Sequence, residues 1–258
     1  MTTAVLALQG AFAEHEKMLA TLGEPTVELR DFCDLKRPFE RLVLCGGEST
    51  AQRRLLVSRG MLNPLRERIE AGMPTLATCA GAILLAEHIV DASAPEPAGA
   101  VRPAALGEPA APGPSMNNSE FLPQGSGGEP PTSTTCGSST NNSEFLPQVS
   151  GGEPPASAER PAALGEPPAL ATFPATAVRN SWGRQLASFH TTAEFAGIGE
   201  VPMTFIRAPH LTDLRNGATP LATVDGRIVA ARCGNQLATA FHPELDADTR
   251  IHELFCEM

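Results

Sequence analysis

The sequence predicts an α/β fold with three layers, in which a mostly parallel central sheet carries helices on both faces. Short apolar segments alternate along the chain with segments of helical periodicity, and this alternation is typical of parallel sheets covered on both sides. The hydrophobic fraction of 42% is enough to bury a core. Apart from one long Pro- and Gly-rich segment, the chain of 258 residues has the length of a single domain.

The N-terminal part of the chain predicts three strands and two helices. An apolar strand at 4–10 ends in glycine, and the helix at 11–23 has apolar residues at helical spacing and stops at another glycine. A short strand at 26–30 and a buried strand at 41–47 follow, the second of which runs into paired glycines. A Ser/Thr cap opens the helix at 49–61.

The remaining elements lie on either side of the Pro- and Gly-rich segment. The helix at 63–72 ends at a glycine, and the strand at 74–79 continues directly into an apolar helix at 80–90. An Asp cap opens a C-terminal helix within 246–258. The strands predicted after the segment are 203–209, 218–226, 227–234 and 236–243.

Residues 91–170 differ in composition from the rest of the chain. They hold 15 of the 24 prolines and 10 of the 23 glycines, and they repeat NNSEFLPQ at 117–124 and 141–148. Such a segment has too few apolar residues to offset the entropy lost on ordering. We therefore expect a long disordered insertion in one domain that is formed by 1–90 and 171–258.

Charge and apolar content restrict the class of protein. The formal net charge of -10 disfavours a nucleic-acid surface, which is basic. No apolar run reaches the ~18 residues that a membrane span needs, and no Lys or Arg precedes the N-terminal apolar run as in a secretory signal. We therefore expect a cytoplasmic protein with reduced cysteines, no metal and no cofactor.

Cys79 lies where a predicted strand meets a predicted helix. The small residues Ala80 and Gly81 follow it, so that the backbone and a substrate can approach the thiol closely. A sharp strand-to-helix turn of this kind presents a nucleophile above the edge of a sheet. The alternative is a buried structural cysteine.

His242 and Glu244 flank Pro243 at the end of another predicted strand. Residues i and i+2 of an extended segment point to the same face, so one turn can deliver an imidazole and a carboxylate together. The carboxylate can fix the imidazole tautomer and stabilise its charged form. The alternative is an ordinary surface loop, because so short a motif is weak by itself.

Gly46 and Gly47 follow a buried strand and precede the helix start at Ser49. Paired glycines permit close approach, and their amides suit a developing oxyanion, although a tight turn before a helix cap would look the same. The three features all follow predicted strands, and open α/β sheets bind ligands at those carboxyl ends. Together they predict an acyl-transfer site.

Seven stretches carry a resemblance to a known family: LALQGAFAEH at 6–15, GGEST at 46–50, TCAG at 78–81, RNSWGRQ at 179–185, FIRAPH at 205–210, RIVAAR at 227–232 and FHPEL at 241–245. In this order they resemble the class I, or triad, glutamine amidotransferases, which have a flavodoxin-like fold. Within that family the chain is similar to the glutaminase subunits of pyridoxal 5'-phosphate synthase. The combination is specific, whereas TCAG or HPE alone is weak.

The resemblance implies a role for each matching residue. Cys79 attacks the side-chain amide of glutamine, His242 transfers the proton, and Glu244 orients His242. The other matching residues bind the substrate or the oxyanion, and Arg179 in particular suits the substrate carboxylate because a guanidinium binds it at two points. These residues are Gly46, Gly47, Glu48, Ser49, Arg179, Ile206 and Arg207.

The resemblance also implies a partner. Ammonia passes to a TIM-barrel synthase subunit in a hetero-oligomer, and this partner assembles pyridoxal 5'-phosphate from a pentose phosphate and a triose phosphate. Gln9 and Gly10 lie near the partner and help to complete the oxyanion hole.

Two residues depart from the family pattern. The family usually has Pro in place of Cys45 and Gly in place of Ala77. An Ala at a position that requires φ above zero costs on the order of 1 kcal/mol. The insertion is the largest departure, and the fold is expected to tolerate it because loop-closure entropy rises slowly with length.

Other interpretations stay open. The chain can be another triad glutaminase, such as the one that feeds histidine synthesis, although RNSWGRQ and FIRAPH speak against this. It can be a catalytically dead regulatory subunit, or the repeat segment can be an interaction module. His15 and His88 fall in predicted helices and are interpreted as structural, and His210 is interpreted as a supporting residue near the pocket.

Overall fold

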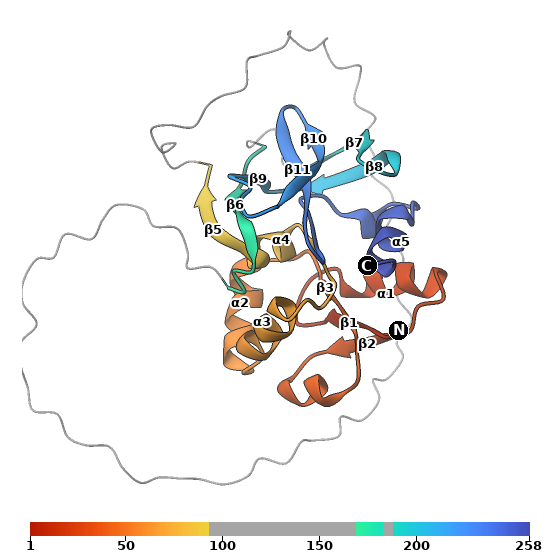
Figure 1. Ribbon diagram of the computed structural model, residues 1–258, viewed down its shortest axis with the longest axis vertical. Helices are drawn as coiled ribbons and strands as arrows, with labels where there is room; N and C mark the ends of the chain where they lie inside the picture. The colour runs from red at the N-terminus through yellow and green to blue at the C-terminus, as the bar shows by residue number, and fades with distance from the viewer. Residues whose placement is uncertain (93–168, 183–187) are drawn as a thin grey trace, which may run out of the picture. The chain divides into compact units, whose positions relative to one another are not determined.

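A twelve-stranded sheet runs through the part of the chain that the computed structural model describes, which is residues 1–92, 169–182 and 188–258 (Figure 1). Its first five strands in spatial order are parallel: β2 (Thr26–Leu29), β1 (Thr3–Leu6), β3 (Arg41–Leu44), β4 (Thr75–Thr78) and β12 (Gln236–Thr239). All residues of β1, β3 and β4 are buried, as expected for strands covered on both faces.

Antiparallel strands extend the sheet beyond β12. In spatial order they are β11 (Arg227–Cys233), β10 (Thr219–Val224), β7 (Ser188–Phe195) and β8 (Gly199–Ile206). A branch leaves β11 through β9 (His210–Thr212), which pairs with β6 (Phe173–Arg179), and β6 pairs in parallel with β5 (Ala86–Asp91). The sheet is therefore parallel from β2 to β12 and antiparallel beyond, except for the parallel pair of β5 and β6.

Helices cover both faces of the parallel strands (Figure 1). Alternate residues of β1 show this directly, since Ala4 and Leu6 pack in one apolar cluster and Val5 packs in the other. One cluster includes α2 (Ser49–Ser58), α3 (Leu62–Glu70) and α4 (Ala80–Leu85), and the other includes α1 (Phe12–Thr21) and α5 (Arg250–Cys256). The predicted three-layer fold is confirmed. Two short 3-10 helices, η1 (Phe32–Lys36) and η2 (Pro243–Leu245), complete the elements.

The helix predicted at 80–90 is wrong in its second half. The helix α4 ends at Leu85, and β5 begins at Ala86, so His88 lies on a strand. Residues 86–91 pair with β6, from Ala86 beside Phe173 to Asp91 beside Arg179. This tertiary pairing overrides the apolar run that suggested one continuous helix. Three strands, β6, β7 and β9, are not apparent from the sequence.

The predicted Ser/Thr cap of α2 is also wrong. The cap is Glu48, whose carboxylate accepts hydrogen bonds from the amides of Thr50 at 3.0 Å and Ala51 at 2.7 Å. Ser49 is the first helical residue and is buried. A carboxylate at this position satisfies free amides and opposes the positive end of the helix dipole.

The predicted insertion, 91–170, falls outside the described residues except at its ends. Asp91 closes β5, and Ala169 and Leu170 are buried in the core. The amide of Leu170 donates to the carbonyl oxygen of Leu84 at 2.9 Å. Both described ends are thus part of the domain. No helix in 1–92, 169–182 or 188–258 is long and apolar enough to span a membrane.

Candidate active site

The parallel strands bring the predicted site residues to one edge of the sheet. Cys79 follows β4. The two strands beside β4 are β3 and β12, and the chain runs from β3 into Gly46 and from β12 into His242. Because carboxyl ends of parallel strands meet at the same edge, residues far apart in sequence converge there. The amide of Cys79 donates to the carbonyl oxygen of Thr239 at 2.8 Å, which joins the ends of β4 and β12.

Cys79 has the backbone of a nucleophile elbow. Its φ of 47° and ψ of -102° are unusual for a residue with a side chain. The sharp turn requires Gly81, because a Cβ there would lie 2.1 Å from the carbonyl oxygen of Leu44. The thiol is nearly buried and lies 3.8 Å from the carbonyl oxygen of Ile206. Strain of this kind persists only where the surrounding structure enforces it, as at functional sites.

His242 and Glu244 form a buried pair. The Nδ1 atom of His242 lies 2.7 Å from Oε1 of Glu244, and both side chains are almost inaccessible to solvent. Burial alone would lower the pKa of His242, but hydrogen bonds with Cys79 and Glu244, together with their charges, raise it to about 10. The imidazole is therefore held in its charged form, between the thiol and the carboxylate.

Of the paired glycines, Gly46 approaches the same imidazole and Gly47 approaches Gln9. A Cβ on Gly46 would lie 2.3 Å from Cε1 of His242, so only glycine fits there. A Cβ on Gly47 would lie 2.5 Å from Oε1 of Gln9. The Gln9 side chain accepts a hydrogen bond from the amide of Glu48 at 2.8 Å, and the carbonyl oxygen of Gly46 accepts one from Ala11 at 3.1 Å. The loops after β1 and β3 are thus tied together beside His242.

The predicted substrate-binding residues lie around this edge. Arg179 ends β6 and forms a two-point ion pair with Asp91, with N–O distances of 3.0 and 3.3 Å. Burial opposes ionisation of Glu48, but hydrogen bonds from the amides of α2 and the charge of Arg179 lower its pKa. The charge of Arg179 therefore acts on the Glu48 carboxylate. Arg207 is exposed, with a φ of 46°, and directly follows Ile206.

The two departures from the family pattern fit the structure. Ala77 is buried in β4 and is not among the residues with positive φ, so its methyl group packs in the core without backbone strain. Cys45 is buried, and its thiol lies 3.2 Å from the carbonyl oxygen of Leu6. Burial raises the pKa of Cys45 to about 12, so this thiol stays protonated. Neither residue disturbs the elbow.

Two histidines lie beside the site, of which the sequence analysis interpreted His15 as structural and did not single out His252. His15 of α1 and His252 of α5 are both fully buried, and their rings are joined by a contact of 2.9 Å between Nδ1 of His15 and Nε2 of His252. The Nε2 atom of His15 lies 3.4 Å from Oε2 of Glu244. A signal was present, because His15 falls on the apolar stripe of its helix, where an unpaired imidazole would be costly.

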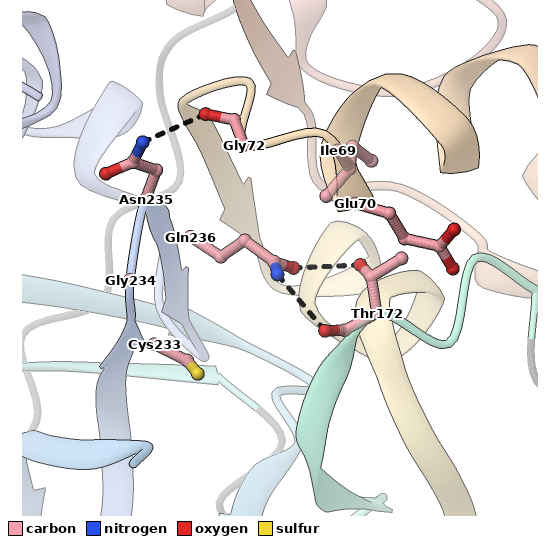
Figure 2. A pocket seen from close by; sticks show the side chains of 8 residues that line it. All are labelled: Ile69, Glu70, Gly72, Thr172, Cys233, Gly234, Asn235 and Gln236. Atoms are coloured by element: carbon pink, nitrogen blue, oxygen red, sulfur yellow. Dashed lines mark hydrogen bonds between the residues drawn. The ribbon is translucent and has the colours of Figure 1, made fainter. Parts of the chain in front are cut away.

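Titratable groups elsewhere do not form a metal site. Within the described ranges, no group of three or more His, Cys, Asp or Glu residues could hold a metal ion. A surface pocket lies at the opposite ends of β4 and β12, where Gln236 bonds to Thr172 and Asn235 bonds to Gly72 (Figure 2). The residues with catalytic chemistry are therefore at the carboxyl edge, away from this pocket.

Comparison with known proteins decides the family. The model of the SNO glutamine amidotransferase family matches residues 5–96 and 165–258. The chain belongs to this family. A curated protein of Desulfitobacterium hafniense (strain Y51), named pyridoxal 5'-phosphate synthase subunit PdxT, is 37% identical over 257 residues that cover 100% of this chain and 92% of the relative. A protein of the same name from Methanocorpusculum labreanum is 38% identical and covers 100% and 97%.

Two solved structures share the fold, and one of them is a glutamine amidotransferase. A crystal structure of a glutamine amidotransferase has a TM-score of 0.66 and 29% identity, with coverage of 99% of this chain and 97% of that chain. A GMP synthase protein of Thermoplasma acidophilum, at 14% identity and a TM-score of 0.53, shares the fold, with coverage of 100% and 92%. The resemblance to glutamine amidotransferases is confirmed, and so is the expected class of activity, glutamine hydrolysis.

Proposed function

We propose that the chain is the glutaminase subunit of a pyridoxal 5'-phosphate synthase, which hydrolyses glutamine and delivers ammonia to a synthase subunit. The observation that carries the proposal is the convergence of Cys79, His242 and Glu244 at one edge of the sheet in a member of the SNO family. Relatives named as subunits of this synthase match along the whole chain, which supports the choice of pathway.

In the proposed reaction, the Cys79 sulfur attacks the side-chain carbonyl carbon of glutamine. The carbonyl oxygen becomes an oxyanion, which the amides near Gly46 and Gly47 would stabilise. His242 is charged and donates its proton to the departing nitrogen, so the C–N bond breaks and ammonia leaves. Water then attacks the thioester with His242 as base, which releases glutamate and restores the thiol.

Glu244 keeps His242 in the required state. Its bond to Nδ1 fixes the ring orientation and leaves Nε2 to face the thiol. The carboxylate also stabilises the charged imidazole, which agrees with the raised pKa of His242. The triad arrangement argues for a working enzyme over a catalytically dead subunit.

The substrate contacts are proposed for residues at the rim of the site. Arg179 and Arg207 would bind the substrate carboxylate, while Glu48, Ser49 and Ile206 would line the glutamine pocket. Gln9 and Gly10 would face the synthase partner. The Glu48 amide donates to the Gln9 side chain and the Ala11 amide donates to Gly46, so their segment would give that partner a direct route to the oxyanion position.

The test is ammonia release from glutamine by the purified chain, measured without and with a pyridoxal 5'-phosphate synthase TIM-barrel subunit. We expect release that rises with this partner and disappears in Cys79→Ala. Release that ignores the partner, but responds to the subunit of another ammonia-using synthase, would assign the chain to a different pathway. No release in either condition would leave the dead-subunit interpretation.

A further inference from the structure

We propose that His15 is a positioning residue for glutamine hydrolysis, which holds the Glu244 carboxylate through its Nε2–H group and is itself held by His252. The inference rests on the proposed function and extends the site beyond the triad, to helices α1 and α5. It follows from the contacts of five buried side chains, which are His15, Thr78, His242, Glu244 and His252.

The second oxygen of the Glu244 carboxylate needs a partner. Oε1 bonds to His242, whereas Oε2 is buried and receives no regular hydrogen bond from any residue in the described part of the chain. His15 Nε2 lies 3.4 Å from Oε2, and both side chains are fully buried. A buried carboxylate oxygen that faces no donor is costly, so the ring of His15 must present a proton there.

The tautomers of the two histidines support this assignment. In one arrangement, His252 donates from Nε2 and Nδ1 of His15 accepts at 2.9 Å. The proton of His15 is then on its Nε2 atom, which faces Glu244 and also lies 3.1 Å from the Thr78 hydroxyl. In the reverse arrangement, the bare Nε2 of His15 would face the carboxylate. The reverse also leaves an N–H on His252 Nδ1, which is buried without a described partner. A buried unpaired donor is costly, so the first arrangement is favoured.

The surroundings keep His15 neutral. Burial lowers its pKa, and the nearby charge of His242 also lowers it, against the opposing charges of Glu244 and Glu14. Burial lowers the pKa of His252 to about 3. A neutral His15 adds no second positive charge beside His242, yet it still donates a hydrogen bond. Burial would raise the pKa of Glu244, but the charge of His15 when it is protonated, together with the hydrogen bond and charge of His242, lowers it below its ordinary value.

The position of His15 also links two parts of the site. Gln9, Gly10 and the N-cap residue Ala11 directly precede helix α1, and the amide of Ala11 donates to the carbonyl oxygen of Gly46. One turn later the same helix presents His15 to Glu244. Helix α1 therefore fixes the glycine loop at its start and the carboxylate of the triad at its centre.

The experiment compares His15→Leu, which removes the donor, with His15→Gln, whose amide can donate from nearly the same place. We expect His15→Leu to lower kcat roughly 10- to 100-fold with little change in KM, the range for losing a hydrogen bond to a charged group. The acid limb of kcat/KM should move to higher pH, because Glu244 without its donor takes up a proton more readily. His15→Gln should recover most of both losses.

The control variant is His88→Leu, which changes an exposed histidine on β5 and should leave rate and pH profile unchanged. Equal losses in His15→Leu and His15→Gln, or an unshifted acid limb, would overturn the proposal in favour of simple packing. Nitrogen-15 NMR of the wild-type chain gives an independent readout that needs no variant to fold. It should show protons on Nε2 of His15 and His252, and protons on Nδ1 would contradict the proposal.

Ammonia release and the NMR tautomers together separate the role of His15 from the proposed function. If the wild-type chain with its synthase subunit releases no ammonia, the proposed function fails, while the NMR tautomers still report on His15. If ammonia release is normal and the tautomers are reversed, only the role of His15 fails.

Discussion

The two edges of the parallel sheet differ in how tightly they are packed. At the carboxyl edge, formed by the loops after β1, β3, β4 and β12, a Cβ on Gly46 would collide with His242 at 2.3 Å. At the amino edge, around the pocket in Figure 2, a Cβ on Gly234 would meet nothing within 4 Å. The polar side chains Asn235 and Gln236 at the amino edge are neutral and hydrogen bonded. The proposed catalytic residues lie at the crowded edge, and none of them lines the open pocket.

Paired cysteine substitutions test this contrast with the largest expected effect. Cys79→Ala at the carboxyl edge should reduce glutamine hydrolysis roughly 10⁴-fold or more, since removal of a nucleophile abolishes covalent catalysis. Cys233→Ala, which lines the amino-edge pocket, should leave kcat/KM unchanged. Comparable losses in both variants, measured as ammonia release with the synthase subunit present, would remove the distinction between the edges.

Paired glycine substitutions should separate activity from stability. Gly46→Ala should lower kcat about 100-fold. The new methyl group would push the His242 ring aside by up to about 1 Å. Gly234→Ala has space for its methyl group but a φ of +55°, so it should cost on the order of 1 kcal/mol of unfolding free energy without loss of activity. Denaturant unfolding and steady-state kinetics measure the two effects, and a fully active Gly46→Ala would contradict the close contact.

The charged imidazole at the carboxyl edge predicts a pH dependence of stability. The pKa of His242 is raised from 6.5 to about 10 in the folded chain. The stabilisation of the folded state by the charged imidazole is therefore complete below pH 6.5 and is lost as pH rises through 10. The free energy of unfolding should therefore fall over that interval. In His242→Asn this part of the fall should be absent, and parallel curves for the two proteins would show that His242 is not charged in the native state.

The smallest effect is expected at the amino edge. Thr172→Val removes the hydroxyl that lies 2.8 Å from Gln236 Oε1, which should cost about 1 kcal/mol of unfolding free energy. Glutamine hydrolysis should not change. A tenfold drop in kcat from this substitution would mean that the two edges are coupled.

The convergence of Cys79, His242 and Glu244, the proposed triad, was predictable because its signals are local. Cys79 sits between an apolar strand and small residues, and His242 and Glu244 are two residues apart after another strand, so a rule about strand ends suffices to bring them together. The role of Gly46 also follows from its place after β3, although its contact with the His242 ring requires coordinates.

Other features depend on tertiary partners that the sequence does not reveal. Residues 86–91 form a strand because β6 lies beside them, and β6 follows the long 91–170 segment in sequence. His15 fits a helical pattern equally well whether it meets an aliphatic side chain or Glu244, which is more than two hundred residues away. Helical periodicity predicts which face is buried, and it does not identify the residue on the other side.

The most direct test of the account is ammonia release from glutamine by the chain mixed with a pyridoxal 5'-phosphate synthase TIM-barrel subunit, compared for wild type, Cys79→Ala and Cys233→Ala. We predict release by the wild type and by Cys233→Ala, and none above background by Cys79→Ala. Release that persists in Cys79→Ala would contradict the assignment of the carboxyl edge as the glutaminase site.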